Sequence, residues 1–266
     1  MQKKGYSKMK KILLAFLASA LILTTAGCGG GDNKDSSETS GKKKVTQVAY
    51  EAPEEEDTTK EAIEYLKNQL PLYSKYLEIR RGIPLTFETE TTTPEGHEIA
   101  GLYIRDDSSI AIRSTDDDGN KLTTIYMDSK FYIVSDKDKT IYSVTYPKDE
   151  IQEIVENNRL KIRLSDAQLF TYEAKATDYK DVAYNSELIY TTSDTPAEYY
   201  FDKATDELKY IVTGNTEIKI LAINNTVTDE VFTLPEDYAN ATVNEYMEKL
   251  EAEAAQTATA EAAPAE

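Results

Sequence analysis

The sequence predicts an α+β fold in which helices pack on an antiparallel β-sheet. Apolar and polar residues alternate in short runs that recur about every 8–12 residues, with Asp- and Gly-rich turns between them, as in a meander of strands. Tyr, Ile and Thr are frequent, and these residue types favour strands. A few segments instead have apolar residues at helical spacing, and each needs a surface against which to bury its apolar face.

The folded part is expected to open with a helix. Thr58 and Glu61 have the spacing of a capping box, in which each side chain binds the other residue's backbone N–H. The apolar residues that follow recur on one helical face: Ala62, Ile63, Leu66 and Leu70. Pro71 cannot continue the hydrogen-bond ladder, so we expect a kink or a short second helix that runs to Gly82.

A first block of strands is expected next, because alternating runs lie between turns. Its apolar residues are Leu85, Phe87, Leu102, Ile104, Ile110, Ile112, Ile125, Met127, Phe131, Ile133, Tyr142, Val144 and Tyr146. A period of two residues makes one face of the sheet apolar and leaves the other face wet or differently packed.

A short helix is expected to interrupt the sheet at 147–158, where a proline stands near the start and acidic residues fill the first turn. A second block of strands then follows. We expect its strands at residues 169–176, 187–192, 198–201, 208–213 and 217–223, with a closing segment at 232–238.

Two pieces of the second block, FDKATDELKYI (residues 201–211) and FTLPEDY (residues 232–238), give the chain a resemblance to the LolA/LppX superfamily of bacterial lipoprotein and lipid carriers. The resemblance covers residues 59–238. It implies a strongly curved antiparallel sheet, an open half-barrel, with an N-terminal helix and an inserted helix on its concave face. It also implies that acyl chains are held between the sheet and the helices.

A cleft of this kind would be lined by the aliphatic face of the sheet. The candidate residues are Leu85, Phe87, Leu102, Ile104, Ile110, Ile112, Ile125 and Phe131. An apolar stripe at strand spacing also fits an ordinary packed core, in which the side chains fill the space themselves. Both interpretations stay open at the level of sequence.

Residues 1–27 have the features of a bacterial export signal. Five lysines and no acidic residue precede the apolar run Ile12–Leu23, which is shorter than the about 20 residues of a membrane-spanning helix. The small residues 24–27 lead to Cys28, the only cysteine, and this stretch resembles a lipobox. We therefore expect a lipid on Cys28 that anchors the chain to the outer face of the bacterial cell membrane. The alternative is ordinary secretion, with cleavage after Ala26.

The rest of the chain divides by composition and charge. Residues 28–58 form a tether expected to be disordered, residues 59–238 one folded domain, and residues 239–266 a C-terminal helix or an acidic, Ala-rich tail. Without residues 1–27 the chain has 25 Lys and Arg against 48 Asp and Glu, a net charge of −23. Such a surface repels nucleic acid, which we exclude as a partner.

The sequence offers little for catalysis. His97 is the only histidine, Cys28 is expected to carry the lipid, and no phosphate-binding loop or nucleophile motif stands in a supporting context. We expect no enzyme, cofactor or metal. The favoured function is a membrane-anchored extracytoplasmic lipoprotein that binds or carries a lipid or other apolar ligand. The alternative is a non-catalytic structural or protein-interaction module at the cell envelope with a filled core.

Overall fold

The computed structural model describes residues 57–94, 96–116, 118–191 and 195–261, and side chains as far as residue 252. The expected signal sequence, Cys28 and nearly all of the expected tether lie outside the described residues. Among the described helices, none combines the length and the apolar character that crossing a bilayer requires.

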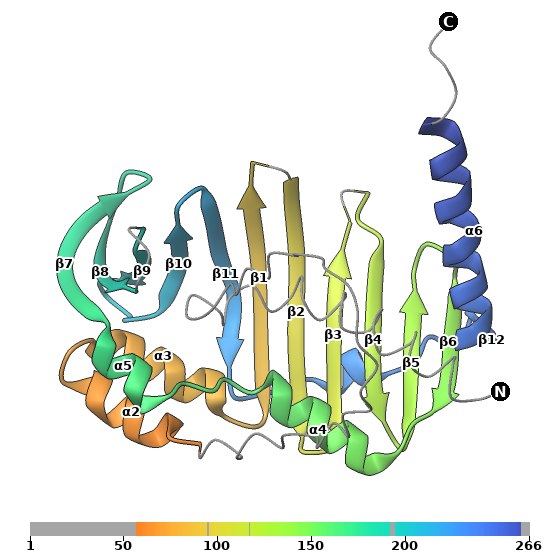
Figure 1. Ribbon diagram of the computed structural model, residues 1–266, viewed down its shortest axis with the longest axis horizontal. Helices are drawn as coiled ribbons and strands as arrows, with labels where there is room; N and C mark the ends of the chain where they lie inside the picture. Colours follow the sequence, from red (N-terminus) through yellow and green to blue (C-terminus); the bar gives the residue numbers. More distant parts are fainter. Residues whose placement is uncertain (1–56, 95, 117, 192–194, 262–266) are drawn as a thin grey trace, which may run out of the picture.

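Twelve strands form one open, curved sheet (Figure 1). The first block contains β1 (Leu85–Thr93), β2 (Gly96–Asp106), β3 (Ser109–Thr115), β4 (Lys121–Met127), β5 (Lys130–Ser135) and β6 (Thr140–Thr145). The second contains β7 (Thr171–Tyr179), β8 (Val182–Tyr190), β9 (Ala197–Asp202), β10 (Leu208–Thr213) and β11 (Thr216–Asn224), and β12 (Ala239–Thr242) follows. The α+β class and the open antiparallel sheet predicted from the sequence are therefore confirmed.

The spatial order of the strands is β12-β6-β5-β4-β3-β2-β1-β11-β10-β9-β8-β7. Each block is a meander of neighbouring strands, and the two blocks join where β1 pairs with β11. The pairing of β12 with β6 is parallel, and the other pairs are antiparallel. The sheet thus continues beyond residue 238, at which we expected the domain to end.

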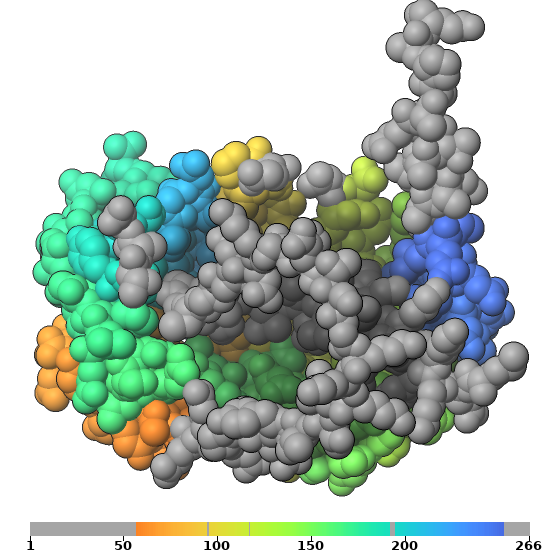
Figure 2. Space-filling view, viewed as in Figure 1, coloured from red at the N-terminus to blue at the C-terminus, as the bar shows by residue number. Residues whose placement is uncertain are grey.

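One face of the sheet carries the helices α2 (Thr59–Lys67), α3 (Pro71–Arg81), α4 (Lys148–Asn158) and α5 (Leu164–Leu169) (Figure 1). We call it the helix face, and the opposite side the outer face. In the space-filling view α2 and α3 (orange) lie against α5 (green) next to the β7–β9 end of the sheet (Figure 2). The expected second helix is confirmed, because α3 begins at Pro71.

The expected capping box at the start of α2 does not form. The side chain of Thr58 does not cap the helix, because its hydroxyl accepts the backbone N–H of Leu164 at 2.9 Å. The carboxylate of Asp57 instead accepts the N–H of Thr59 at 3.0 Å. Thr58 therefore joins the beginning of α2 to the beginning of α5, a helix that the sequence did not predict.

Both faces of the sheet are packed over β2–β6. On the outer face Tyr103, Ala111, Ile125 and other side chains form a second apolar cluster. The segment between β11 and β12 covers this cluster with Val231 and Phe232 of the short helix η1 (Asp229–Phe232). The chain thus reaches β12 by crossing the outer face of the first block.

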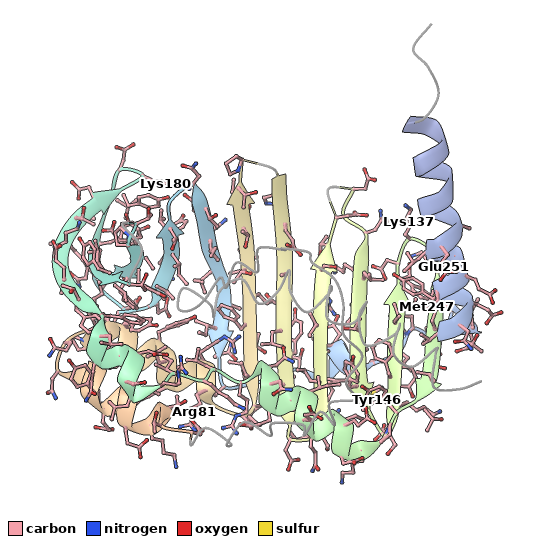
Figure 3. The ribbon with its side chains drawn as sticks, viewed as in Figure 1. Arg81, Lys137, Tyr146, Lys180, Met247 and Glu251 are labelled. Atoms are coloured by element: carbon pink, nitrogen blue, oxygen red, sulfur yellow. The ribbon has the colours of Figure 1, made fainter. Side chains whose placement is uncertain are left out.

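The helix α6 (Val243–Glu261) follows β12 directly and stands at the β12–β6 end of the sheet (Figure 1). Tyr246 packs on Tyr142 of β6, with ring centroids 4.8 Å apart. Lys249 forms an ion pair with Asp138 in the turn before β6. Met247 and Glu251 are labelled on this helix, and Tyr146 marks the end of β6 near α4 (Figure 3).

Candidate functional site

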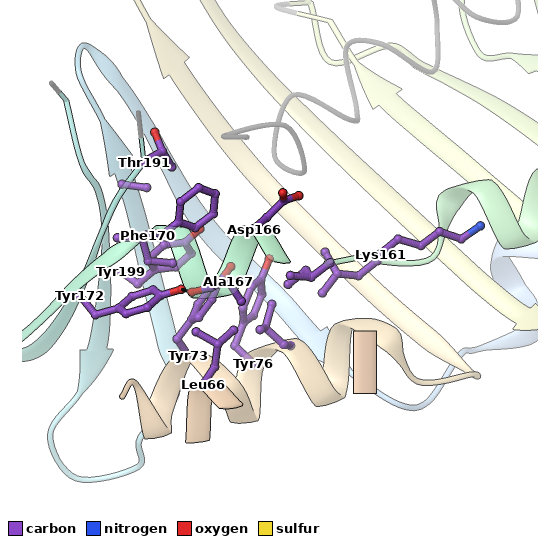
Figure 4. A pocket seen from close by; sticks show the side chains of 15 residues that line it. Leu66, Tyr73, Tyr76, Lys161, Asp166, Ala167, Phe170, Tyr172, Thr191 and Tyr199 are labelled. Carbon is purple, nitrogen blue, oxygen red and sulfur yellow. Dashed lines mark hydrogen bonds between the residues drawn. The ribbon is translucent and has the colours of Figure 1, made fainter. Parts of the chain in front are cut away.

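A pocket of about 110 Å³ lies between the helices and the β7–β9 end of the sheet. Leu66 of α2 and Tyr73 and Tyr76 of α3 form one side, and Tyr172 of β7 and Tyr199 of β9 form the other (Figure 4). The pocket is enclosed mainly by aromatic and aliphatic side chains, which is the usual character of a small-ligand site. It is the best-defined candidate site of the described residues.

Glu187 of β8 holds the first turn of α3 in place beneath the pocket. Its two carboxylate oxygens accept the backbone N–H groups of Leu72, at 3.0 Å, and of Tyr73, at 2.6 Å. These are N–H groups that have no partner within the helix. Burial raises the pKa of Glu187, although the two N–H groups favour its charged form.

Three tyrosines form the inner wall of the pocket. The ring centroids of Tyr73 and Tyr199 lie 4.6 Å apart, and Tyr76 lies 5.8 Å from Tyr73 and 6.1 Å from Tyr199. Burial raises the pKa of all three phenols, so their hydroxyl groups stay protonated at neutral pH. The wall thus offers flat apolar surfaces with neutral hydroxyl groups and no negative charge.

The helix α5 closes the pocket from the side. Its Ala167 lines the pocket and accepts a hydrogen bond from the hydroxyl of Tyr172. Burial raises the pKa of Tyr172 to about 12. The segment before α5 is fixed to α2, because the Thr59 hydroxyl accepts the N–H of Ile162 at 3.0 Å. The pocket therefore depends on contacts between segments about 100 residues apart in the chain.

A second and larger hollow, of about 600 Å³, lies between α3 and the strands β9–β11. Its lining mixes apolar residues such as Ile79 and Leu221 with charged ones. Two of the charged residues, Lys75 and Asp206, form an ion pair at 2.9 Å. This mixed and open surface is less suited to an apolar ligand than the tyrosine-lined pocket.

The cleft residues predicted from the sequence line neither hollow. Seven of them are buried on the helix face and belong to its packed core: Leu85, Phe87, Leu102, Ile104, Ile110, Ile112 and Phe131. Ile125 lies on the opposite face, where it packs with Tyr103 and Ala111, and its grouping with the other seven was wrong. The reason is that Ile125 and its neighbour Tyr126 are both buried, so alternation alone did not reveal the face.

The tyrosines of the pocket were not predicted as site residues. Their signal in the sequence was the spacing of Tyr73 and Tyr76 on one helical face, which by itself also fits a packed core. Tyr172 and Tyr199 come from strands far along the chain, and nothing in the sequence indicates which strands meet α3.

The described residues contain no group of three or more His, Cys, Asp and Glu side chains placed to hold a metal ion. His97 lies on β2, where its Nε2 is 3.0 Å from Oε1 of Glu90. Both side chains are partly exposed.

Comparisons with known proteins find solved structures of low similarity. No protein-family model and no curated protein matches the chain. An uncharacterized conserved protein from Thermus thermophilus matches with a TM-score of 0.35 and 8% identity, over 64% of this chain and 99% of that one. A LolA superfamily protein from Nitrosomonas europaea matches with a TM-score of 0.25 and 7% identity, over 62% of this chain and 96% of that one.

The MucA/MucB complex of Pseudomonas aeruginosa matches with a TM-score of 0.37 and 12% identity, over 67% of this chain and 62% of that one. The architecture, an open curved sheet with helices on one face, is the one that the LolA/LppX resemblance implied. At these TM-scores the matches carry no argument about family, ligands or partners.

Proposed function

We propose that the chain is a lipid-anchored extracytoplasmic binding protein, attached through Cys28, that takes the apolar end of a ligand into the tyrosine-lined pocket. The observation that carries the proposal is the pocket itself. A built-in space of about 110 Å³ remains between side chains that are otherwise closely packed. Apolar cavities of about 150 Å³ bind benzene, so this pocket suits a ring or the last few carbons of an alkyl chain.

The size of the pocket limits the proposal. A whole lipid does not fit into about 110 Å³, and the aliphatic face of β1–β5 is already filled by its own side chains. The apolar end of the ligand therefore enters the pocket alone, between α3, α5 and the strands β7–β9. Lys161 and Asp166 extend away from the tyrosines at the rim (Figure 4).

The test is the uptake of a fluorescent fatty acid by the full chain, purified without detergent. Ala167→Leu fills the pocket and is expected to weaken uptake at least tenfold. Ala111→Leu is the matched control, since it also enlarges a buried alanine but lies on the outer face. Both changes overpack a buried site, which costs about 1–3 kcal/mol. Equal loss of uptake in both variants would show that the pocket is not the binding site.

The rival function is a non-catalytic interaction module with a filled core. The seven buried residues of the helix face favour it, because they pack in one cluster and line neither of the hollows found among the described residues. The same experiment separates the two functions. A folded wild-type chain that takes up no fluorescent fatty acid, and carries no lipid in native mass spectrometry, supports the interaction module.

A further inference from the structure

Arg80 of α3 is a buried arginine to which the described residues supply no acidic partner. The residue is 2% exposed, and its Nη1 has no hydrogen-bond partner. The guanidinium instead lies over the ring of Phe87, 4.7 Å from the centroid. The adjacent Arg81, by contrast, forms an ion pair with Asp57 at 2.6 Å. Arg81 therefore has an anionic partner, whereas Arg80 has none among the described residues.

An unpaired cation in an apolar core is unfavourable, because burial removes its hydration and nothing replaces it. Burial lowers the pKa of Arg80, yet an arginine side chain stays charged in proteins at neutral pH. The contact with Phe87 offsets part of the lost hydration. A buried polar group without a partner calls for an explanation, and an anionic ligand supplies one.

The carboxylates near the pocket are already engaged elsewhere. Asp166 lies at the rim of the pocket and pairs with Arg163 at 2.9 Å. Glu187 accepts two N–H groups at the opposite end of α3. Neither of these acids pairs with Arg80 in the described part of the chain.

Arg80 and the pocket tyrosines lie along one stripe of α3. Tyr76 follows Tyr73 by three residues, and Arg80 follows Tyr76 by four. The three side chains therefore project from the same side of the helix and are buried on the helix face. Tyr76 lines the pocket, and Arg80 follows it after about 6 Å along the helix axis. Arg80 itself lines neither hollow, so a headgroup reaches Arg80 from the pocket only by displacing side chains that bury it.

We propose that Arg80 is a headgroup site, which binds the carboxylate or phosphate of an alkyl-chain anion whose apolar end occupies the tyrosine-lined pocket. The inference rests on the proposed function, because it assigns the ligand class of the same pocket. It goes further in requiring a negative charge on the ligand. Both oxyanions match the forked donors of a guanidinium, and phosphate and carboxylate headgroups are distinguished by experiment.

The experiment measures binding of decanoate, decyl phosphate and decanol to the full chain by calorimetry. Arg80→Met keeps the length and the apolar character of the side chain and removes its charge. Arg81→Met is the matched control on the same helix. The wild type and Arg81→Met are expected to bind at least one of the two anions at least tenfold more tightly than decanol. Arg80→Met is expected to lose this preference and to keep its affinity for decanol.

The two anions then identify the headgroup, since the tighter binder shows whether a carboxylate or a phosphate is preferred. Equal binding of all three probes by the wild type would overturn the headgroup site and leave the pocket standing. Failure of all three probes to bind would overturn the proposed function as well. Retention of the preference in Arg80→Met would also refute the assignment.

Melting temperature without ligand gives an independent readout. Arg80→Met is expected to melt higher than the wild type, because replacing an uncompensated buried charge by an apolar side chain removes an unfavourable burial. Arg81→Met is expected to melt no higher than the wild type. A lower melting temperature for Arg80→Met would show that the folded chain itself supplies a partner for Arg80, which contradicts the proposal.

Discussion

The two halves of the sheet are covered differently. Over β2–β6 the helix face and the outer face are both apolar and packed, the latter beneath Val231 and Phe232. Over β7–β10 the outer face instead carries a cluster of four tyrosines, Tyr179, Tyr184, Tyr200 and Tyr210. Lys180 marks this cluster at the tip of the β7–β8 hairpin (Figure 3). Among the described residues, other segments thus cover the first half on both faces, whereas the outer face of the second half has tyrosines that pack on one another.

This difference shows where a binding protein of this fold can keep empty space. Strands that are packed on both faces have little freedom to move, and the described side chains of their core are closely packed. The second half contains the pocket, and its walls are tyrosines, whose rings are apolar and whose hydroxyl groups tolerate water. Stability and the proposed binding are therefore assigned to different ends of one continuous sheet.

The largest expected effect is on the free energy of unfolding. Two phenylalanines, one in each half of the sheet, test whether the packed half contributes more to stability. Phe131 of β5 is 1% exposed and its ring lies 4.6 Å from that of Tyr126, so Phe131→Ala is expected to lower the free energy of unfolding by about 3–5 kcal/mol. Phe170 lines the pocket and is only partly buried. Phe170→Ala is expected to cost less than half as much, measured by urea unfolding of the full chain. Similar losses in both variants would contradict the comparison.

A smaller loss of stability is expected from a change at Glu187, which joins the pocket end of the sheet to α3. Glu187→Gln replaces one of two acceptor oxygens by a donor and leaves one N–H of α3 unpaired. The free energy of unfolding at neutral pH should fall by about 1–3 kcal/mol. Glu61→Gln, on the exposed side of α2, is the matched control for loss of a carboxylate.

The same variant has a defined pH dependence. Burial raises the pKa of Glu187 above 4.5, so the folded state binds the proton more tightly than the unfolded state. The stabilisation by Glu187 is then complete below the unfolded pKa and decreases as the pH rises through the folded pKa. The advantage of the wild type over Glu187→Gln should be largest near about pH 4 and smaller near about pH 7. A constant difference across this range would show that Glu187 has no raised pKa.

The smallest effect is expected at the surface of the pocket half. Asp206 has a φ of 58° and pairs with Lys75, and both side chains are well exposed. Asp206→Asn keeps a residue type that tolerates left-handed backbone, so only the ion pair is lost, at about 0.2–1 kcal/mol. High salt should abolish the difference from the wild type. Asp206→Ala should cost more, because alanine disfavours this conformation by about 1–2 kcal/mol.

The sequence was sufficient for most elements of the fold. Alternation between turns located β1–β6, and Pro71 located the start of α3. It was insufficient for α5, which has only six residues and no helical period of its own. It also missed β12, whose four residues show no alternation. Short elements of this kind are fixed by the partners on which they lie, here α2 and β6.

The candidate site was harder to predict for a related reason. Alternation identified the buried face of β1–β5 correctly for Leu85 and Ile104 but could not distinguish a core from a cleft. The pocket is formed where α3, α5 and β9 meet, and this meeting depends on the pairing of strands that are distant in sequence. The charge of Arg80 was visible in the sequence, whereas its burial without an acid was not.

The order of the strands has a consequence for how the chain folds. β1 pairs with β11, and β6 pairs with β12, so the first meander obtains both of its outer neighbours from the last part of the chain. Until residues 216–224 and 239–242 are available, a nascent or truncated chain has a six-stranded sheet with two unpaired edges. Unpaired edges are templates for association with other chains, and distant pairings form slowly. The last quarter of the folded domain therefore protects the first half from aggregation.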